Sequence, residues 1–145
     1  MSAAVAAMPL DPPPRRARFG AWLFLAIGVL GMAAVWIVLS LWNGRPNGWM
    51  AVVAALDLAW MLRLGAWPRG ASRALAATAG TLAVALLANW GTVASQLAGF
   101  FGLDPLESAL RLGAHHAWTL ITLANGAWDA AWLLLALAVA AIAGR

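Results

Sequence analysis

Four long apolar segments, separated by short connections, dominate this sequence. They cover residues 19–42, 48–64, 74–101 and 117–143. A helix rises about 1.5 Å per residue, so about 20 apolar residues cross a hydrocarbon core about 30 Å thick. The chain is 64% hydrophobic and 10% charged, and a small water-soluble core cannot hide that much apolar surface. We therefore predict an all-α, polytopic membrane protein in which four transmembrane helices form a bundle, with the lipid bilayer as solvent.

The connections contain residues that end helices. "NGRPNG" (43–48) and "GAWPRGAS" (65–72) are rich in turn formers. In the third connection Asp104 is placed as an N-cap, Pro105 as the first helical residue and Glu107 as the partner of a capping box. We predict here a short helix in the membrane interface, before the fourth span.

The arginines predict the orientation of the spans. Only Arg45 and Arg111 lie in the first and third connections, and the other arginines flank the first span, the second connection and the chain end (Arg15, Arg16, Arg18, Arg63, Arg69, Arg73, Arg145). Arginine accumulates on the cytoplasmic side of membrane proteins, so both termini are predicted to be cytoplasmic. The basic residues form no patch interleaved with aromatic residues, and we expect no nucleic-acid partner.

These patterns divide the chain into two parts. Residues 1–18 are expected to form a disordered, Pro- and Arg-rich cytoplasmic tail, and residues 19–145 the four-helix transmembrane domain. An Ala-, Arg- and Trp-rich composition without Lys is typical of high-GC bacterial genomes, so we predict a multi-pass protein of the bacterial inner membrane.

Polar residues inside the apolar segments are the candidate functional residues. Asp57 and Asp129 occur in the repeated phrase D-x-A-W-x-L, and both are expected at hydrocarbon depth. Helical spacing places further polar residues on one stripe of the third segment and one of the fourth. Such stripes avoid lipid, so we predict a polar seam buried between helices (Asp57, Asn89, Gln96, Asn125, Asp129).

The seam has three interpretations. A central Asp costs about 2.5–3.5 kcal/mol on insertion scales, and a hydrogen bond in the membrane returns only about 0.6–2 kcal/mol. The two aspartates could join helices, within this chain or to a partner; they could form a proton or cation relay; or they could line a substrate or cofactor pocket. A carboxyl without a cationic partner favours its neutral form, and we expect at least one of the two to be protonated at neutral pH.

His115 and His116 are a second candidate group, for ligand binding or pH sensing. Adjacent residues on a helix point about 100° apart and do not easily hold one metal ion together. The chain has no Cys, which excludes thiolate metal sites and disulfides. We therefore predict no metal and no cofactor.

The sequence contains no nucleotide-binding or hydrolase motif, and the leading hypothesis is a non-enzymatic membrane protein. It would act as an accessory subunit of a membrane-protein partner or as a homo-oligomer, with its polar seam between helices. A proton-coupled transporter or channel using Asp57 and Asp129 is the alternative. A third hypothesis is a membrane enzyme subunit that binds quinone or haem near His115 and His116.

Overall fold

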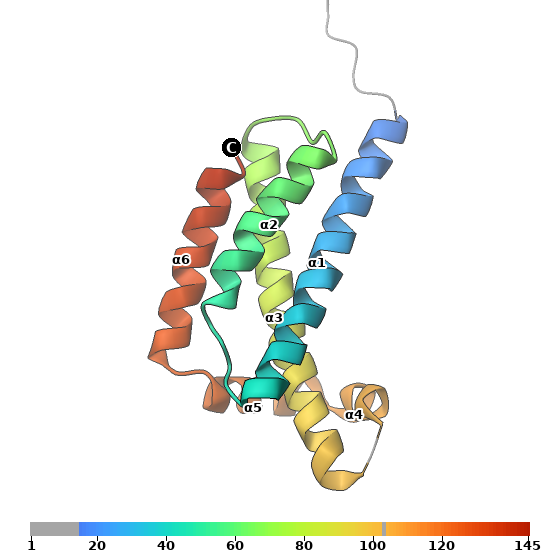
Figure 1. Cartoon of the computed structure of the whole chain (residues 1–145), viewed down its shortest axis with the longest axis vertical. Coiled ribbons are helices and arrows are strands. Elements are labelled where there is room, and N and C mark those ends of the chain that lie inside the picture. Colours follow the sequence, from blue (N-terminus) through green and yellow to red (C-terminus); the bar gives the residue numbers. More distant parts are fainter. Residues whose placement is uncertain (1–14, 103) are drawn as a thin grey trace, which may run out of the picture.

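The computed structural model describes residues 15–102 and 104–145. Within these residues every regular element is a helix, as predicted (Figure 1). The helices are α1 (Arg15–Asn43), α2 (Met50–Leu64), α3 (Ala71–Phe101), α4 (Pro105–Arg111), α5 (Ala114–Ala124) and α6 (Ala127–Ala143).

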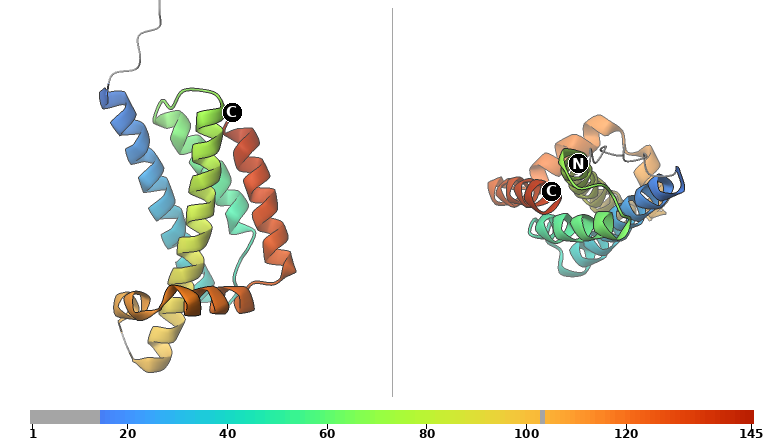
Figure 2. Two further views of the ribbon diagram at one scale, coloured as in Figure 1. Left: turned by 180° about the vertical axis from the view of Figure 1, so that it is seen from behind. Right: turned by 90° about the horizontal axis from the view of Figure 1, so that it is seen from above.

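Helices α2 and α3 form a central pair. They contact each other, and both contact α1 and α6, whereas α1 and α6 share no contact among the described residues. The short helices α4 and α5 contact α3 and lie across one end of the longer helices (Figure 2). The start of α1 and the end of α6 both lie at the opposite end, on opposite sides of the central pair (Figure 1).

Small residues let the central helices approach closely. The buried core contains Ala51 and Ala55 of α2 and Ala136 and Ala140 of α6, each pair one helical turn apart. Alanine and glycine at such spacing allow backbones to pack directly, as in membrane helices. A Cβ added at Gly65 would lie 2.8 Å from Ala21 Cα, which shows how near α1 approaches the end of α2.

Two helices are long and apolar enough to cross a membrane, namely residues Phe19–Asn43 of α1 and the whole of α3. Their outward residues are apolar, including Phe19, Leu30 and Val38 on α1. This combination indicates a membrane protein. Helix α2 has 15 residues, fewer than the roughly 20 that a perpendicular crossing needs.

The fourth apolar segment was predicted to form one helix, and the structure differs. It is divided into α5 and α6, which are bent by 102° relative to each other. Asn125 has an extended backbone (φ −101°, ψ 121°) and is followed by Gly126. Asn-Gly favours a turn over a helix, and this dipeptide was the sequence signal for the break. Only if α5 and α6 are taken as one broken span do they add a third candidate crossing.

The boundaries of two other elements also test the sequence analysis. Helix α1 already begins at Arg15, inside the predicted tail, and residues 1–14 of that tail lie outside the described residues. Helix α4 begins as predicted, since the Asp104 side chain accepts a 2.9 Å hydrogen bond from Leu106 N. Glu107 does not complete a capping box; it forms a 2.6 Å ion pair with Arg111.

Candidate functional site

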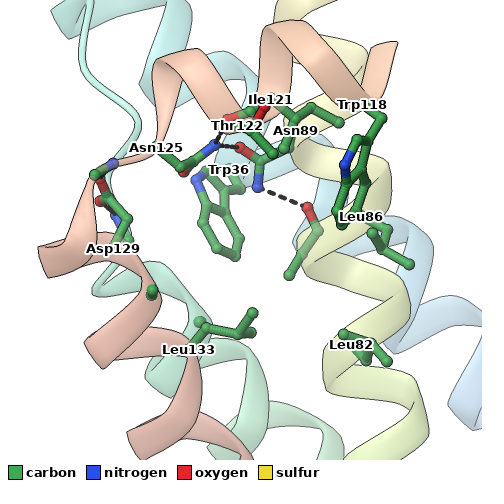
Figure 3. Close-up of a pocket in the computed structure, with 15 residues that line it drawn as sticks. Trp36, Leu82, Leu86, Asn89, Trp118, Ile121, Thr122, Asn125, Asp129 and Leu133 are labelled. Carbon is green, nitrogen blue, oxygen red and sulfur yellow. Dashed lines mark hydrogen bonds between the residues drawn. The ribbon is translucent and has the colours of Figure 1, made fainter. Parts of the chain in front are cut away.

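A cavity of about 350 Å³ lies where α5 and α6 meet α3 (Figure 3). Its walls are mostly apolar, and its polar groups gather around the α5–α6 break. Its lining includes Trp36, Leu82, Leu86, Asn89, Trp118, Thr122, Asn125, Asp129 and Leu133. Small-molecule sites in proteins are typically about 300–1,000 Å³, apolar, with a few convergent polar groups, and this cavity has that character.

Two asparagines join the break to α3. Asn125 Nδ2 donates to Asn89 Oδ1 at 2.7 Å and to the carbonyl of Ile121 at 2.9 Å. Asn89 Nδ2 in turn donates to the carbonyl of Ala85 at 2.8 Å. Asn125 Oδ1 accepts no hydrogen bond from the residues that the structure describes, so it is available to a molecule in the cavity.

Asp129 joins the same break to the α1–α2 connection. Its Oδ1 accepts a 3.2 Å hydrogen bond from Gly48 N, and its Oδ2 accepts one of 3.1 Å from Gly126 N. The second bond caps the first turn of α6, where a carboxylate is also favoured by the helix dipole. Asp129 thus lies at a helix start, beside a connection, and not midway along a continuous apolar helix as the sequence analysis expected.

The α1–α2 connection, which contacts Asp129 through Gly48, is itself held by several hydrogen bonds. Trp36 Nε1 donates to the carbonyl of Pro46 at 2.8 Å. Asn47 Nδ2 donates to Ser40 Oγ at 3.2 Å and to Asn43 Oδ1 at 3.0 Å. Asn47 has a φ of 51°, a conformation that asparagine tolerates better than most residues.

Sequence analysis missed Trp36 and Asn47. Asn47 belongs to a turn motif whose internal hydrogen bonds the sequence does not reveal. Trp36 lies in an apolar run, and nothing in that run distinguishes a cavity-lining indole from one that faces lipid.

The structure does not bring the whole predicted seam together. Asn89, Asn125 and Asp129 line one cavity, but Gln96 is exposed on α3 and outside it. Asp57 lies midway along α2, half-buried opposite Gly28 of α1. Asp57 forms no side-chain hydrogen bond with any described residue, so no hydrogen-bonded path joins it to Asp129 within that part of the chain.

The histidines lie outside the cavity lining. His115 and His116 are exposed in the first turn of α5, with ring centroids 6.2 Å apart and planes at 82°. The described residues contain no group of three or more His, Cys, Asp or Glu side chains that could hold a metal ion.

Comparisons with known protein families, with characterised proteins and with solved structures gave no match.

Proposed function

We propose that this protein is a non-enzymatic integral membrane protein whose cavity binds the polar end of an amphiphilic molecule. The observation that carries the proposal is the Asn89–Asn125 hydrogen bond at the α5–α6 break, which holds polar groups at one end of an otherwise apolar cavity. Polar side chains in an apolar protein are costly unless they are paired or bind something. An acceptor in a cavity wall that has no protein partner, such as Asn125 Oδ1, can accept a hydrogen bond from a ligand.

The free polar atoms define the chemistry of the ligand. Asn125 Oδ1 is an acceptor, and Thr122 donates its hydroxyl proton to the carbonyl of Thr119 at 2.8 Å, which leaves its oxygen as an acceptor. The Asp129 carboxylate has further lone pairs. We infer that the ligand presents hydrogen-bond donors, such as hydroxyl or ammonium groups. Its apolar part would lie against Leu82, Leu86 and Leu133.

We further propose a multi-pass arrangement in a bacterial inner membrane, with four crossings in a bundle and cytoplasmic termini. It is supported by the distribution of arginines along the sequence and by the start of α1 and the end of α6, which lie at the same end of the molecule (Figure 1). A membrane-protein partner or a homo-oligomer is part of the same proposal. Copurification of a tagged chain in mild detergent tests for it, and a chain that copurifies with nothing and runs as a monomer contradicts that part.

The ligand proposal is tested by identifying what the protein retains. The chain would be purified in mild detergent and its bound small molecules extracted and analysed by mass spectrometry. We expect an amphiphile with donor groups to be retained by the wild type and lost from Asn125→Leu. Gln96→Leu is the matched control, since it removes an amide outside the cavity. Equal retention by both variants, or no retained molecule in the wild type, would falsify the proposal.

A further inference from the structure

Four arginines converge at the end of the molecule opposite the cavity. Arg63, Arg69, Arg73 and Arg145 line a pocket of about 510 Å³ together with Ala66 and Trp67. They come from the end of α2, the α2–α3 connection, the first turn of α3 and the second residue after α6. No acidic side chain lines this pocket, and the only ion pair among the described residues, Glu107–Arg111, belongs to α4.

Two of these arginines are held in place by the end of α6 and the two residues that follow it. Arg73 is buried, and its Nε donates to the carbonyl of Gly144 at 2.7 Å while its Nη2 donates to that of Arg145. Arg63 Nη2 donates to the carbonyl of Ala143 at 3.2 Å. Arginine donors thus satisfy the carbonyls of the last residue of α6 and of the two residues after it. A guanidinium has five N–H donors, so both residues keep donors for a ligand.

The side chains of the other two arginines are not held by hydrogen bonds to described residues. Arg69 and Arg145 are exposed, and their side chains donate no hydrogen bond to a described residue. Planar guanidinium groups match the oxygens of a phosphate. A pocket that combines two fixed and two free guanidinium groups therefore suits a phosphate-bearing anion.

An apolar groove lies next to the arginine pocket. Trp67 lines the pocket and packs edge-on against Trp22, with ring centroids 5.0 Å apart. Trp22 is in turn the first residue of a groove of about 490 Å³ between α1 and α3, which continues past Leu25, Val29, Ala79 and Ala83. Tryptophan favours the headgroup level of a membrane. The order along the molecule is therefore basic pocket, indole pair and apolar groove.

We propose that this end of the protein binds an anionic phospholipid, with its phosphate among the four arginines and an acyl chain in the α1–α3 groove. A free phosphate would use the pocket but not the groove, and the groove is what favours the lipid. Basic pockets between membrane helices are known to take lipid headgroups in this way. The inference is independent of the ligand proposed for the cavity at the other end.

The test is retention of phosphatidylglycerol by the detergent-purified full chain, measured by native mass spectrometry against phosphatidylcholine. We expect preferential retention of phosphatidylglycerol, and its affinity to fall about thirtyfold in Arg69→Gln/Arg145→Gln, since each arginine near a headgroup contributes about a factor of five. Arg45→Gln/Arg111→Gln changes the net charge equally at the other end and should change the affinity less than twofold. Equal losses in both double variants, or no preference between the two lipids, would overturn the proposal.

A second arm separates the lipid from a free anion. Ala79→Phe fills the groove at an exposed position and should weaken retention of phosphatidylglycerol, whereas Ala138→Phe, exposed on α6, should not. Thermal unfolding in detergent confirms that both variants fold. If Ala79→Phe leaves retention unchanged, no acyl chain lies in the groove; if millimolar inorganic phosphate displaces the lipid, the pocket binds the free anion. Either result makes the lipid assignment wrong.

Discussion

The side-chain amide of Asn125 donates to Asn89 Oδ1 at 2.7 Å, across the junction between the α5–α6 break and α3. The two residues are 36 positions apart in the sequence, so this bond, together with that between Asp129 and Gly48, helps to hold the broken segment against the rest of the molecule. Hydrogen bonds between membrane helices contribute about 0.6 kcal/mol on average and about 2 kcal/mol at most.

A double-mutant cycle measures that bond. Asn89→Ala and Asn125→Ala should each lower the free energy of unfolding, and their effects should be non-additive, with a coupling energy of about 0.5–2 kcal/mol. Unfolding in mixed detergent micelles provides the measurement. Strict additivity would show that the two amides do not interact.

Gly48 should not tolerate a side chain. A Cβ at this position would lie 2.5 Å from Asp129 Oδ1 and 3.0 Å from Asp129 Cα, so Gly48→Ala must push α6 away from the connection. We expect a destabilisation of about 1–3 kcal/mol, which is typical of overpacking. Gly99→Ala is the control, because nothing lies within 4 Å of its Cβ position; it should be neutral or stabilising by up to about 1 kcal/mol. Similar thermal unfolding of the two variants would contradict the packing described.

Asp129 and Asp57 should behave differently. Asp129→Ala removes an acceptor for both Gly48 N and Gly126 N and should cost about 0.5–2 kcal/mol, the usual loss of a helix cap. Asp129→Asn keeps one acceptor oxygen and should cost less. Asp57→Asn breaks no described hydrogen bond, so its thermal unfolding should match that of the wild type.

The same Asp57→Asn variant tests the transport hypothesis. We expect it to retain the cavity ligand as the wild type does, because Asp57 is not among the residues lining the cavity. If purified chain in proteoliposomes instead shows a pH-driven flux that Asp57→Asn abolishes, the proton relay of the sequence analysis is the better account.

The proposed topology is tested by labelling single cysteines. The natural chain has no Cys, so Arg69→Cys, Arg145→Cys and Arg45→Cys each introduce one reactive thiol. A membrane-impermeant maleimide applied to intact spheroplasts should label only Arg45→Cys, and applied to inverted vesicles only the other two. Labelling of Arg45→Cys and Arg145→Cys from the same side would refute the four-crossing arrangement.

The sequence predicted helix positions well where apolar runs ended in clear turn residues. The helices α1, α2 and α3 lie close to the predicted segments, and α4 begins at the predicted N-cap Asp104. The prediction of one continuous fourth helix was wrong because it relied on the mean hydropathy of a long segment. Two residues, Asn125 and Gly126, lower that mean only slightly. Local backbone preference prevailed there over the apolar pattern.

The site was predictable only in part, for a similar reason. Helical spacing grouped Asn125 with Asp129 and pointed to Asn89 on the neighbouring helix. All three line one cavity, although the continuous helix assumed for that grouping is broken between Asn125 and Asp129. It placed Gln96 in the same seam, but α4 and α5 cover the face of α3 that carries Val93, Ala94 and Ala98, and Gln96 is exposed on another face. Asp57 was grouped with Asp129 because both occur in the phrase D-x-A-W-x-L. A shared phrase does not place two residues at the same membrane depth when one of the two helices is broken.

The unequal lengths of the outer helices have a consequence for the surrounding bilayer. The apolar span of α1 has 25 residues and α6 has 17, which correspond to about 38 Å and about 26 Å. They lie on opposite flanks of the central pair, so lipids on the α1 flank meet a wall longer than a typical hydrocarbon core of about 30 Å, and lipids on the α6 flank meet a shorter one. A membrane around this protein should thus be lopsided, and its thinned flank would bring water close to the start of α6.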